Sequence, residues 1–154
     1  MRDYSTVSPR FWLGKTGKQI RAAGAAVQVA ALYLMTSPHA NMLGLYYLPI
    51  DYLAHETGLA PEVAQVSLGK LGEIGFCDYD DATECVWVRE MAKFQIGTQL
   101  KEGDKRCAGV QREYLGLPDN RLLVPFFNKY AGRFHMKTSR DGLPENEKPH
   151  LCPS

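Results

Sequence analysis

The chain has 154 residues, of which 45% are hydrophobic and 23% charged, as in an ordinary globular protein of about one domain. It contains no run of about 18 apolar residues, which excludes a membrane-spanning helix, and its polar start lacks the features of a signal peptide, so we expect a cytoplasmic protein. The net charge of +1 is unevenly spread along the chain. Basic residues predominate in 1–43 and 92–154, whereas residues 44–91 contain nine acidic residues and only two basic ones.

The N-terminal third predicts a lead-in followed by one long helix. Residues 1–17 contain Pro9 and two glycines, and we expect them to be extended. Apolar residues then recur at helical spacing between Lys18 and Met35, which predicts a helix over 18–35. Pro38 ends this pattern, because proline disfavours a helical conformation in the residue before it.

The middle of the chain predicts a strand and two short helices. Residues 43–48 are apolar and aromatic, which is typical of a strand. Pro49 precedes a predicted helix over 50–57 that Gly58 ends, and Pro61 opens a second helix over 61–74 that Gly75 ends. Two helices joined by such a short, glycine-containing turn are the signature of a helix-turn-helix.

Two further strands are predicted directly after these helices, over 76–79 and 85–89, with the polar segment 80–84 between them. The resulting order of helix, strand, helix, helix, strand, strand is that of a winged helix. The predicted fold class is therefore mostly α with a small β-hairpin wing (α+β), a winged helix-turn-helix with extra C-terminal helices.

The extra helices are predicted over 104–115 and 119–130, and we expect them to pack back on the winged helix. Residues 136–154 are polar and rich in proline, which indicates a disordered tail or linker. The predicted organisation is thus an extended lead-in over 1–17, a winged-helix domain with its C-terminal helices over 18–135, and a tail over 136–154.

Motifs of enzymes and metal sites are missing from the sequence. The four cysteines lack CxxC spacing, although Cys77 and Cys85 flank the predicted hairpin and could face each other across it. No P-loop, HExxH or GxSxG motif occurs. We therefore expect no cofactor, no metal and no catalytic residue.

Several motifs together resemble the N-terminal winged-helix domain of phage replisome organisers, which are replication initiators. The motifs are NMLGLYYLP at 41–49, TGL at 57–59, LGKL at 68–71 with GF at 75–76, VWV at 86–88, LYL at 32–34 ahead of SP at 37–38, and FF at 126–127 with Lys129 and Tyr130. The resemblance covers roughly residues 5–135. It implies a DNA-binding phage or prophage protein that recognises a replication origin and helps to recruit the host helicase or its loader, often through a separate C-terminal domain.

The predicted second helix of the helix-turn-helix would place its outer face in the major groove. With Ala64, Leu68 and Leu71 inward, the candidate base-reading residues are Glu62, Gln65, Val66, Gly69 and Lys70. Four acidic residues of the hairpin should repel phosphates, so we expect phosphate contacts from basic residues elsewhere. These are Arg10, Lys15, Lys18, Arg21, Lys101, Lys105 and Arg106.

Other interpretations of the same pattern stay open. The exposed helix face could be ordinary solvated surface, and four tyrosines (Tyr46, Tyr47, Tyr52 and Tyr79) could stack on bases or serve as core. The acidic middle segment favours a protein-interaction module whose acidic face binds a basic partner. A transcriptional regulator would differ from an initiator mainly in its DNA target, and either could be a homodimer that binds paired half-sites.

Overall fold

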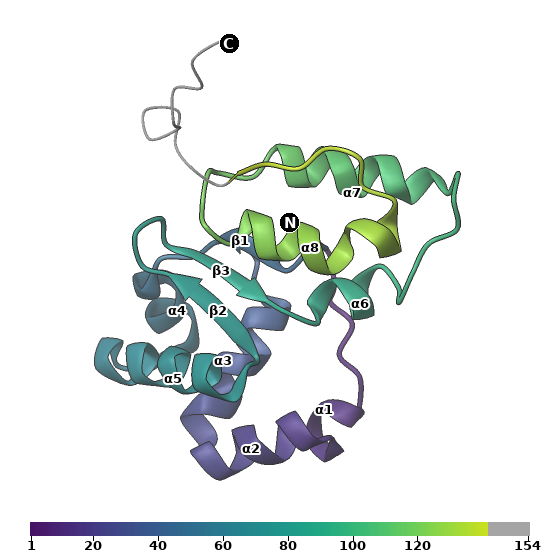
Figure 1. The fold of residues 1–154 in the computed structure, drawn as a ribbon. Coiled ribbons are helices and arrows are strands. Elements are labelled where there is room, and N and C mark those ends of the chain that lie inside the picture. Colours follow the sequence, from purple (N-terminus) through teal and green to yellow (C-terminus); the bar gives the residue numbers. More distant parts are fainter. Residues whose placement is uncertain (142–154) are drawn as a thin grey trace.

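The computed structural model describes residues 1–141 as a mostly helical chain around a small three-stranded antiparallel sheet (Figure 1). The α+β class is therefore as predicted. The elements in order are α1 (Arg10–Leu13), α2 (Lys15–Ala23), α3 (Ala25–Thr36), β1 (Leu45–Tyr47), α4 (Ile50–Thr57), α5 (Pro61–Ile74), β2 (Cys77–Asp80), β3 (Cys85–Val88), α6 (Met91–Gln95), α7 (Lys105–Leu115) and α8 (Leu123–Phe134).

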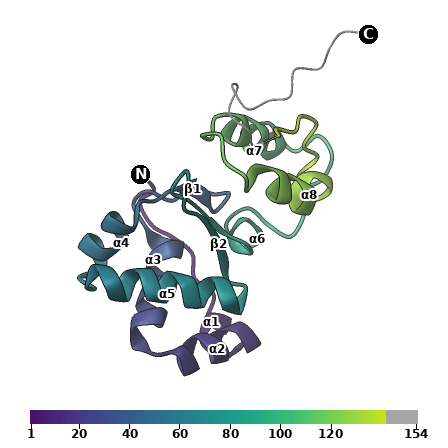
Figure 2. The same cartoon turned by 60° about the vertical axis from the view of Figure 1, so that its left-hand side comes forward.

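The sheet has the order β1-β3-β2, with β3 in the centre and buried along its whole length. Because side chains alternate between the faces of a strand, β3 serves two cores at once. Val86 and Val88 lie in a core formed with α2 to α5, whereas Cys85 and Trp87 lie in a second core formed with α7 and α8. The sheet is thus a central layer with helices on both faces (Figures 1 and 2).

The two cysteines of the hairpin do not face each other. In the register of β2 and β3, Cys77 is opposite Val88 and Cys85 is opposite Asp80. Cys77 lies in the first core and Cys85 in the second, so the two thiols are on opposite faces of the sheet. Within residues 1–141, no cluster of three or more potential metal-ligating side chains occurs.

The individual helices and strands predicted for the middle of the chain are present, with the first strand limited to Leu45–Tyr47. Helices α4 and α5 have the predicted bounds, and Gly58 and Gly75 end them in the left-handed conformation. Both strands of the hairpin are present, shifted by at most one residue. The C-terminal helices do pack back, since Phe126 of α8 lies against Trp87 of β3 with ring centroids 6.1 Å apart.

The N-terminal predictions are partly wrong. Residues 1–17 are not wholly extended, because they contain α1 and the start of α2, with Phe11 packed against the first core. The single helix predicted over 18–35 is two helices that meet at Gly24. The φ of +118° and ψ of 166° at Gly24 belong to a region that is essentially restricted to glycine, so the chain turns there before α3 begins.

The C-terminal helices differ in detail from the prediction. Helix α6 was not predicted, and α8 begins at Leu123 rather than at Asp119. The later start places Pro125 in the first turn of α8, where its missing N–H costs no helical hydrogen bond. A helix from Asp119 would have put Pro125 in its interior. Instead, the Asn120 side chain accepts a hydrogen bond from the Leu122 N–H at 2.9 Å and forms a turn.

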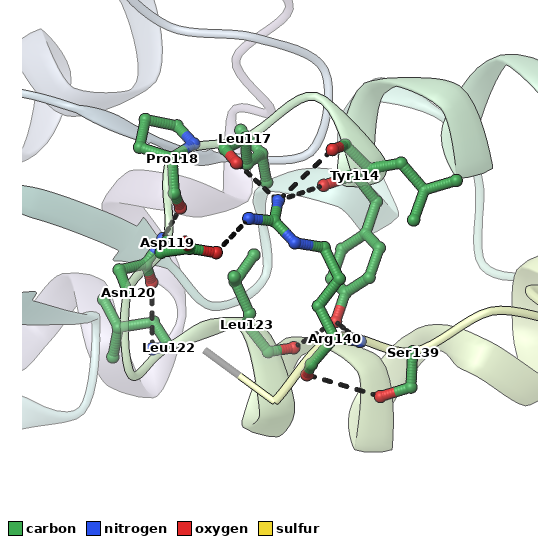
Figure 3. Close-up of polar contacts among 10 residues, drawn as sticks. Tyr114, Leu117, Pro118, Asp119, Asn120, Leu122, Leu123, Ser139 and Arg140 are labelled. Atoms are coloured by element: carbon green, nitrogen blue, oxygen red, sulfur yellow. Dashed lines mark hydrogen bonds and ion pairs between the residues drawn. The ribbon is translucent and has the colours of Figure 1, made fainter. Parts of the chain in front are cut away.

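The predicted disorder from residue 136 is wrong for residues 136–141, whereas residues 142–154 lie outside the described residues. Met136 is buried in the second core. The Arg140 guanidinium donates hydrogen bonds to the carbonyls of Tyr114 and Leu115, each at 3.3 Å, and also to the carbonyl of Leu117 and to the Asp119 carboxylate (Figure 3). A cation at this end of α7 also complements the helix dipole.

Replacing Arg140 by methionine should lower the free energy of unfolding by about 1–3 kcal/mol, because it removes charge-assisted hydrogen bonds, including those that the carbonyls of Leu115 and Leu117 accept from Arg140. Urea unfolding followed by circular dichroism measures the change. Arg112→Met is the matched control, since Arg112 is an exposed residue of α7. Equal losses in the two variants would show that the Arg140 contacts contribute nothing to stability.

Candidate nucleic-acid interface

Helix α5 is buried on one side and open on the other. Proline at its first position and the tight turn from α4 set its start, and Ala64, Ser67, Leu68 and Leu71 hold it on the first core. The opposite face is exposed, and all five predicted base-reading residues are on it: Glu62, Gln65, Val66, Gly69 and Lys70. The buried stripe in the sequence was therefore sufficient to predict which side of α5 a ligand can reach.

The chemistry of this outward face is mixed. Gln65 and Lys70 make no hydrogen bond or ion pair with another side chain of the described residues 1–141. Val63 and Val66 are 41% and 57% exposed, and Glu73 is also exposed. An amide, a cation and apolar methyl groups suit base edges in a major groove. The two glutamates of this face do not suit nearby phosphates.

Gly69 is at the centre of the outward face. A Cβ built there meets no heavy atom within 4 Å, so glycine is not required by packing within the chain. Gly69→Ala should therefore raise the free energy of unfolding by about 1 kcal/mol through higher helix propensity. If α5 enters a groove closely, the same variant should bind duplex DNA more weakly. Thermal unfolding measures the stability and titration with a DNA duplex measures the affinity of the same preparation. A Gly69→Ala variant less stable than the wild type would contradict the first expectation.

Basic residues of the N-terminal helices lie near α5. Arg10, Lys15, Lys18 and Arg21 are all exposed, and no residue from 1 to 141 forms an ion pair with them. Helix α2 packs beside α5, held by Ile20 in the first core (Figures 1 and 2). The structure thus brings α2, which contains Lys15, Lys18 and Arg21, next to the predicted base-reading helix, whereas Arg10 belongs to α1.

The second predicted basic group lies elsewhere. Lys101, Lys105 and Arg106 precede or begin α7, on the far side of the sheet from α5 (Figures 1 and 2). The Arg106 guanidinium is also committed within the chain, because it pairs with Asp104 at 2.9 Å and donates to the Ile96 carbonyl at 3.3 Å. These three residues are not part of the surface that contains α2 and α5.

The acidic hairpin is partly neutralised by the fold. Asp78 accepts two hydrogen bonds from Arg89, at 2.6 and 2.8 Å, and Asp80 lies 3.4 Å from Arg121. Burial raises the pKa of Asp80, but hydrogen bonds from Thr83 and the Ala82 N–H, with Arg121 nearby, hold it below its usual value. Sequence reasoning missed both pairs: Arg89 is 11 residues from Asp78, at the end of the neighbouring strand, and Arg121 comes from a segment 41 residues from Asp80. Asp81 and Glu84 remain as acidic residues of the hairpin.

Two of the four tyrosines considered for base stacking are structural. Tyr46 is buried and donates to the Leu34 carbonyl at 2.6 Å, and Tyr79 donates to the Leu48 carbonyl at 2.9 Å. Tyr47 and Tyr52 are 47% and 43% exposed, with their ring centroids 6.4 Å apart. Only this second pair is accessible to a stacking partner.

Two hydrogen-bonded tyrosines, Tyr33 and Tyr46, lead us to expect that the folded protein loses stability at alkaline pH. Burial and the hydrogen bond to Glu56 raise the pKa of Tyr33 to about 12, and burial also raises the pKa of Tyr46. Because an unfolded tyrosine ionises near pH 10, the folded state should be fully stabilised below that value and should lose stability as the pH rises through 12. Urea unfolding across this range tests the expectation, and Tyr33→Phe should show a shallower loss. A flat profile would contradict it.

Comparison of the chain with family models, with curated proteins and with solved structures found no match. None of the helices in residues 1–141 has the length and apolar character needed to cross a bilayer. The residues described above therefore carry the functional argument alone.

Proposed function

We propose that this protein is a winged-helix DNA-binding protein of phage or prophage origin, with a role in replication initiation. The elements α3, β1, α4, α5, β2 and β3 follow the order of a winged helix, and the sheet order β1-β3-β2 is compatible with it. In this interpretation α5 is the recognition helix and the β2–β3 hairpin is the wing.

The observation that carries the proposal is the exposed side of α5 next to the basic helix α2. Protein–DNA interfaces separate positioning contacts to phosphates from base contacts that give specificity. Lys15, Lys18 and Arg21 supply the first kind of contact, while Gln65 and Lys70 supply the second. The ion pairs of Asp78 with Arg89 and of Asp80 with Arg121 weaken the repulsion of phosphates expected from the wing.

The assignment to replication rests on the resemblance to phage replisome organisers. It implies origin recognition and recruitment of a helicase or its loader. A transcriptional regulator would use the same face of α5, so selection of bound fragments from phage DNA separates the two roles. Enrichment of a replication origin supports initiation, and enrichment of promoters supports regulation.

Titration of a fluorescent duplex with the protein at rising salt tests the proposal. Lys15→Glu/Lys18→Glu should bind far more weakly than the wild type, and the slope of log affinity against log salt should fall by about 2, because two phosphate contacts are lost. Lys101→Glu/Lys105→Glu changes the same charge on the other side of the sheet and should bind like the wild type. No binding of any duplex at low salt, or equal losses in both variants, would refute the proposal.

A second candidate is a protein-interaction module that uses the same helix. The exposed Val63 and Val66, together with Glu62 and Glu73, favour a partner with an apolar and basic surface. Val63→Ser/Val66→Ser should then abolish binding to a purified helicase loader. If the double variant binds that partner as well as the wild type does, this second candidate fails.

A further inference from the structure

A cavity of about 280 Å³ lies beside α1 and the start of α2; its lining includes none of the outward-face residues of α5, but it shares Lys15 with the proposed DNA-binding surface. It is bounded by four parts of the chain: residues 6–17, which include α1 and the start of α2; Met35 of α3; residues 75–76; and residues 88–95 at the end of β3 and in α6. Its walls are mainly apolar, with the side chains of Val7, Phe11, Met35, Val88, Met91 and Phe94. The volume is nearly twice that of the ~150 Å³ apolar cavity that holds a benzene molecule, so a chain or double ring of about ten carbons fits.

The cavity is lined by hydroxyl groups from Thr6, Ser8 and Thr16 and by four charged or amide side chains, which are of two kinds. Glu90 and Gln95 are already engaged: the Glu90 carboxylate accepts from Lys129 at 2.7 Å, and Gln95 accepts from Arg2 at 3.2 Å and donates to the Thr6 carbonyl at 2.9 Å. Arg10 and Lys15 also line the cavity, are exposed, and form no ion pair with any of residues 1–141. The available charge at the cavity is therefore positive.

We propose that this cavity binds a small amphipathic anion, whose apolar body of about ten carbons lies against Phe11, Met35 and Met91 and whose carboxylate pairs with Arg10 and Lys15. Methionine side chains adapt to irregular apolar ligands, and guanidinium groups bind carboxylates through charge-assisted hydrogen bonds. This inference does not depend on DNA binding by α5.

Decanoate is the probe, and decanol and decyltrimethylammonium are controls with the same chain but a different head group. Calorimetric titration should show one saturable decanoate site, with decanol roughly tenfold weaker and the cation weaker still. In Arg10→Gln/Lys15→Gln, decanoate affinity should fall roughly tenfold to that of decanol, while decanol binding stays unchanged. Lys101→Gln/Lys105→Gln, the matched control, should bind all three as the wild type does.

Methionine methyl NMR locates the bound probe. Decanoate should shift the methyl signals of Met35 and Met91, which line the cavity, and leave those of Met42 and Met136 unchanged. Val7→Phe should reduce binding by filling the cavity. The proposal is overturned if decanoate shows no saturable binding, if Met42 or Met136 shifts instead, or if Arg10→Gln/Lys15→Gln binds decanoate as tightly as the wild type.

Discussion

Alanine at position 44 is expected to lower the free energy of unfolding by about 2–4 kcal/mol. Gly44 precedes β1 with a φ of +73°, in the left-handed region. A Cβ there would lie 2.6 Å from the Met91 Cβ and 3.0 Å from the Val88 carbonyl oxygen. An alanine would therefore cause both backbone strain and steric overlap with Met91 and Val88. The same junction also contains the hydrogen bond from the Val88 N–H to the Gly44 carbonyl, at 2.8 Å.

Gly58→Ala separates the cost of the strained backbone from the cost of the steric overlap. Gly58 has a similar φ of +77°, but a Cβ there meets no heavy atom within 4 Å, so only the conformational cost of about 1–2 kcal/mol applies. Urea unfolding of both variants gives the difference directly. If Gly44→Ala is no less stable than Gly58→Ala, the close packing of β1, β3 and α6 around Gly44 is not as described.

Phe126→Ala should cost about 3–5 kcal/mol, the usual range for a large aromatic residue removed from a core. Phe126 is fully buried, with its ring centroid 5.8 Å from that of Tyr114 and 5.0 Å from that of Tyr130. It also contacts Trp87, so its loss removes an aromatic contact between α8 and the sheet.

Phe94→Ala is the control for this variant, because Phe94 is 52% exposed. Unfolding followed by tryptophan fluorescence is informative, since Trp87 reports on the second core. A loss in Phe126→Ala no larger than that in Phe94→Ala would show that α7 and α8 are not held on the sheet by this cluster.

The local features of the sequence predicted the part of the fold that holds α5. Pro49, Gly58, Pro61 and Gly75 fix the ends of α4 and α5 by the conformations that these residues favour or exclude. Such signals need no information from distant segments. The outward face of α5 followed from the same local pattern, because the buried stripe of a helix also defines its exposed side.

The errors arose where distant contacts decide the outcome. Nothing near residue 140 indicates that its guanidinium reaches the end of α7, and nothing near Asp80 indicates that Arg121 approaches it. The break at Gly24 is a case of another kind, because an isolated glycine in a helical pattern is often tolerated, whereas Gly24 has a φ of +118° that ends α2.

In the candidate site, too, local features were predicted from the sequence and the positions of distant segments were not. Sequence predicted two groups of basic residues without their positions in space. The fold places Lys15, Lys18 and Arg21 beside α5 and places Lys101 and Lys105 across the sheet. The apolar cavity near α1 was not predicted at all, because its walls come from four separate segments.

The most direct test of the account is amide chemical-shift mapping of the labelled protein with a duplex DNA. We predict that the largest shifts fall in residues 61–73 and 15–21, with little change in residues 101–106. Shifts concentrated in α7, or binding that leaves the amides of α5 unchanged, would contradict the assignment of α5 and α2 as the DNA-binding surface.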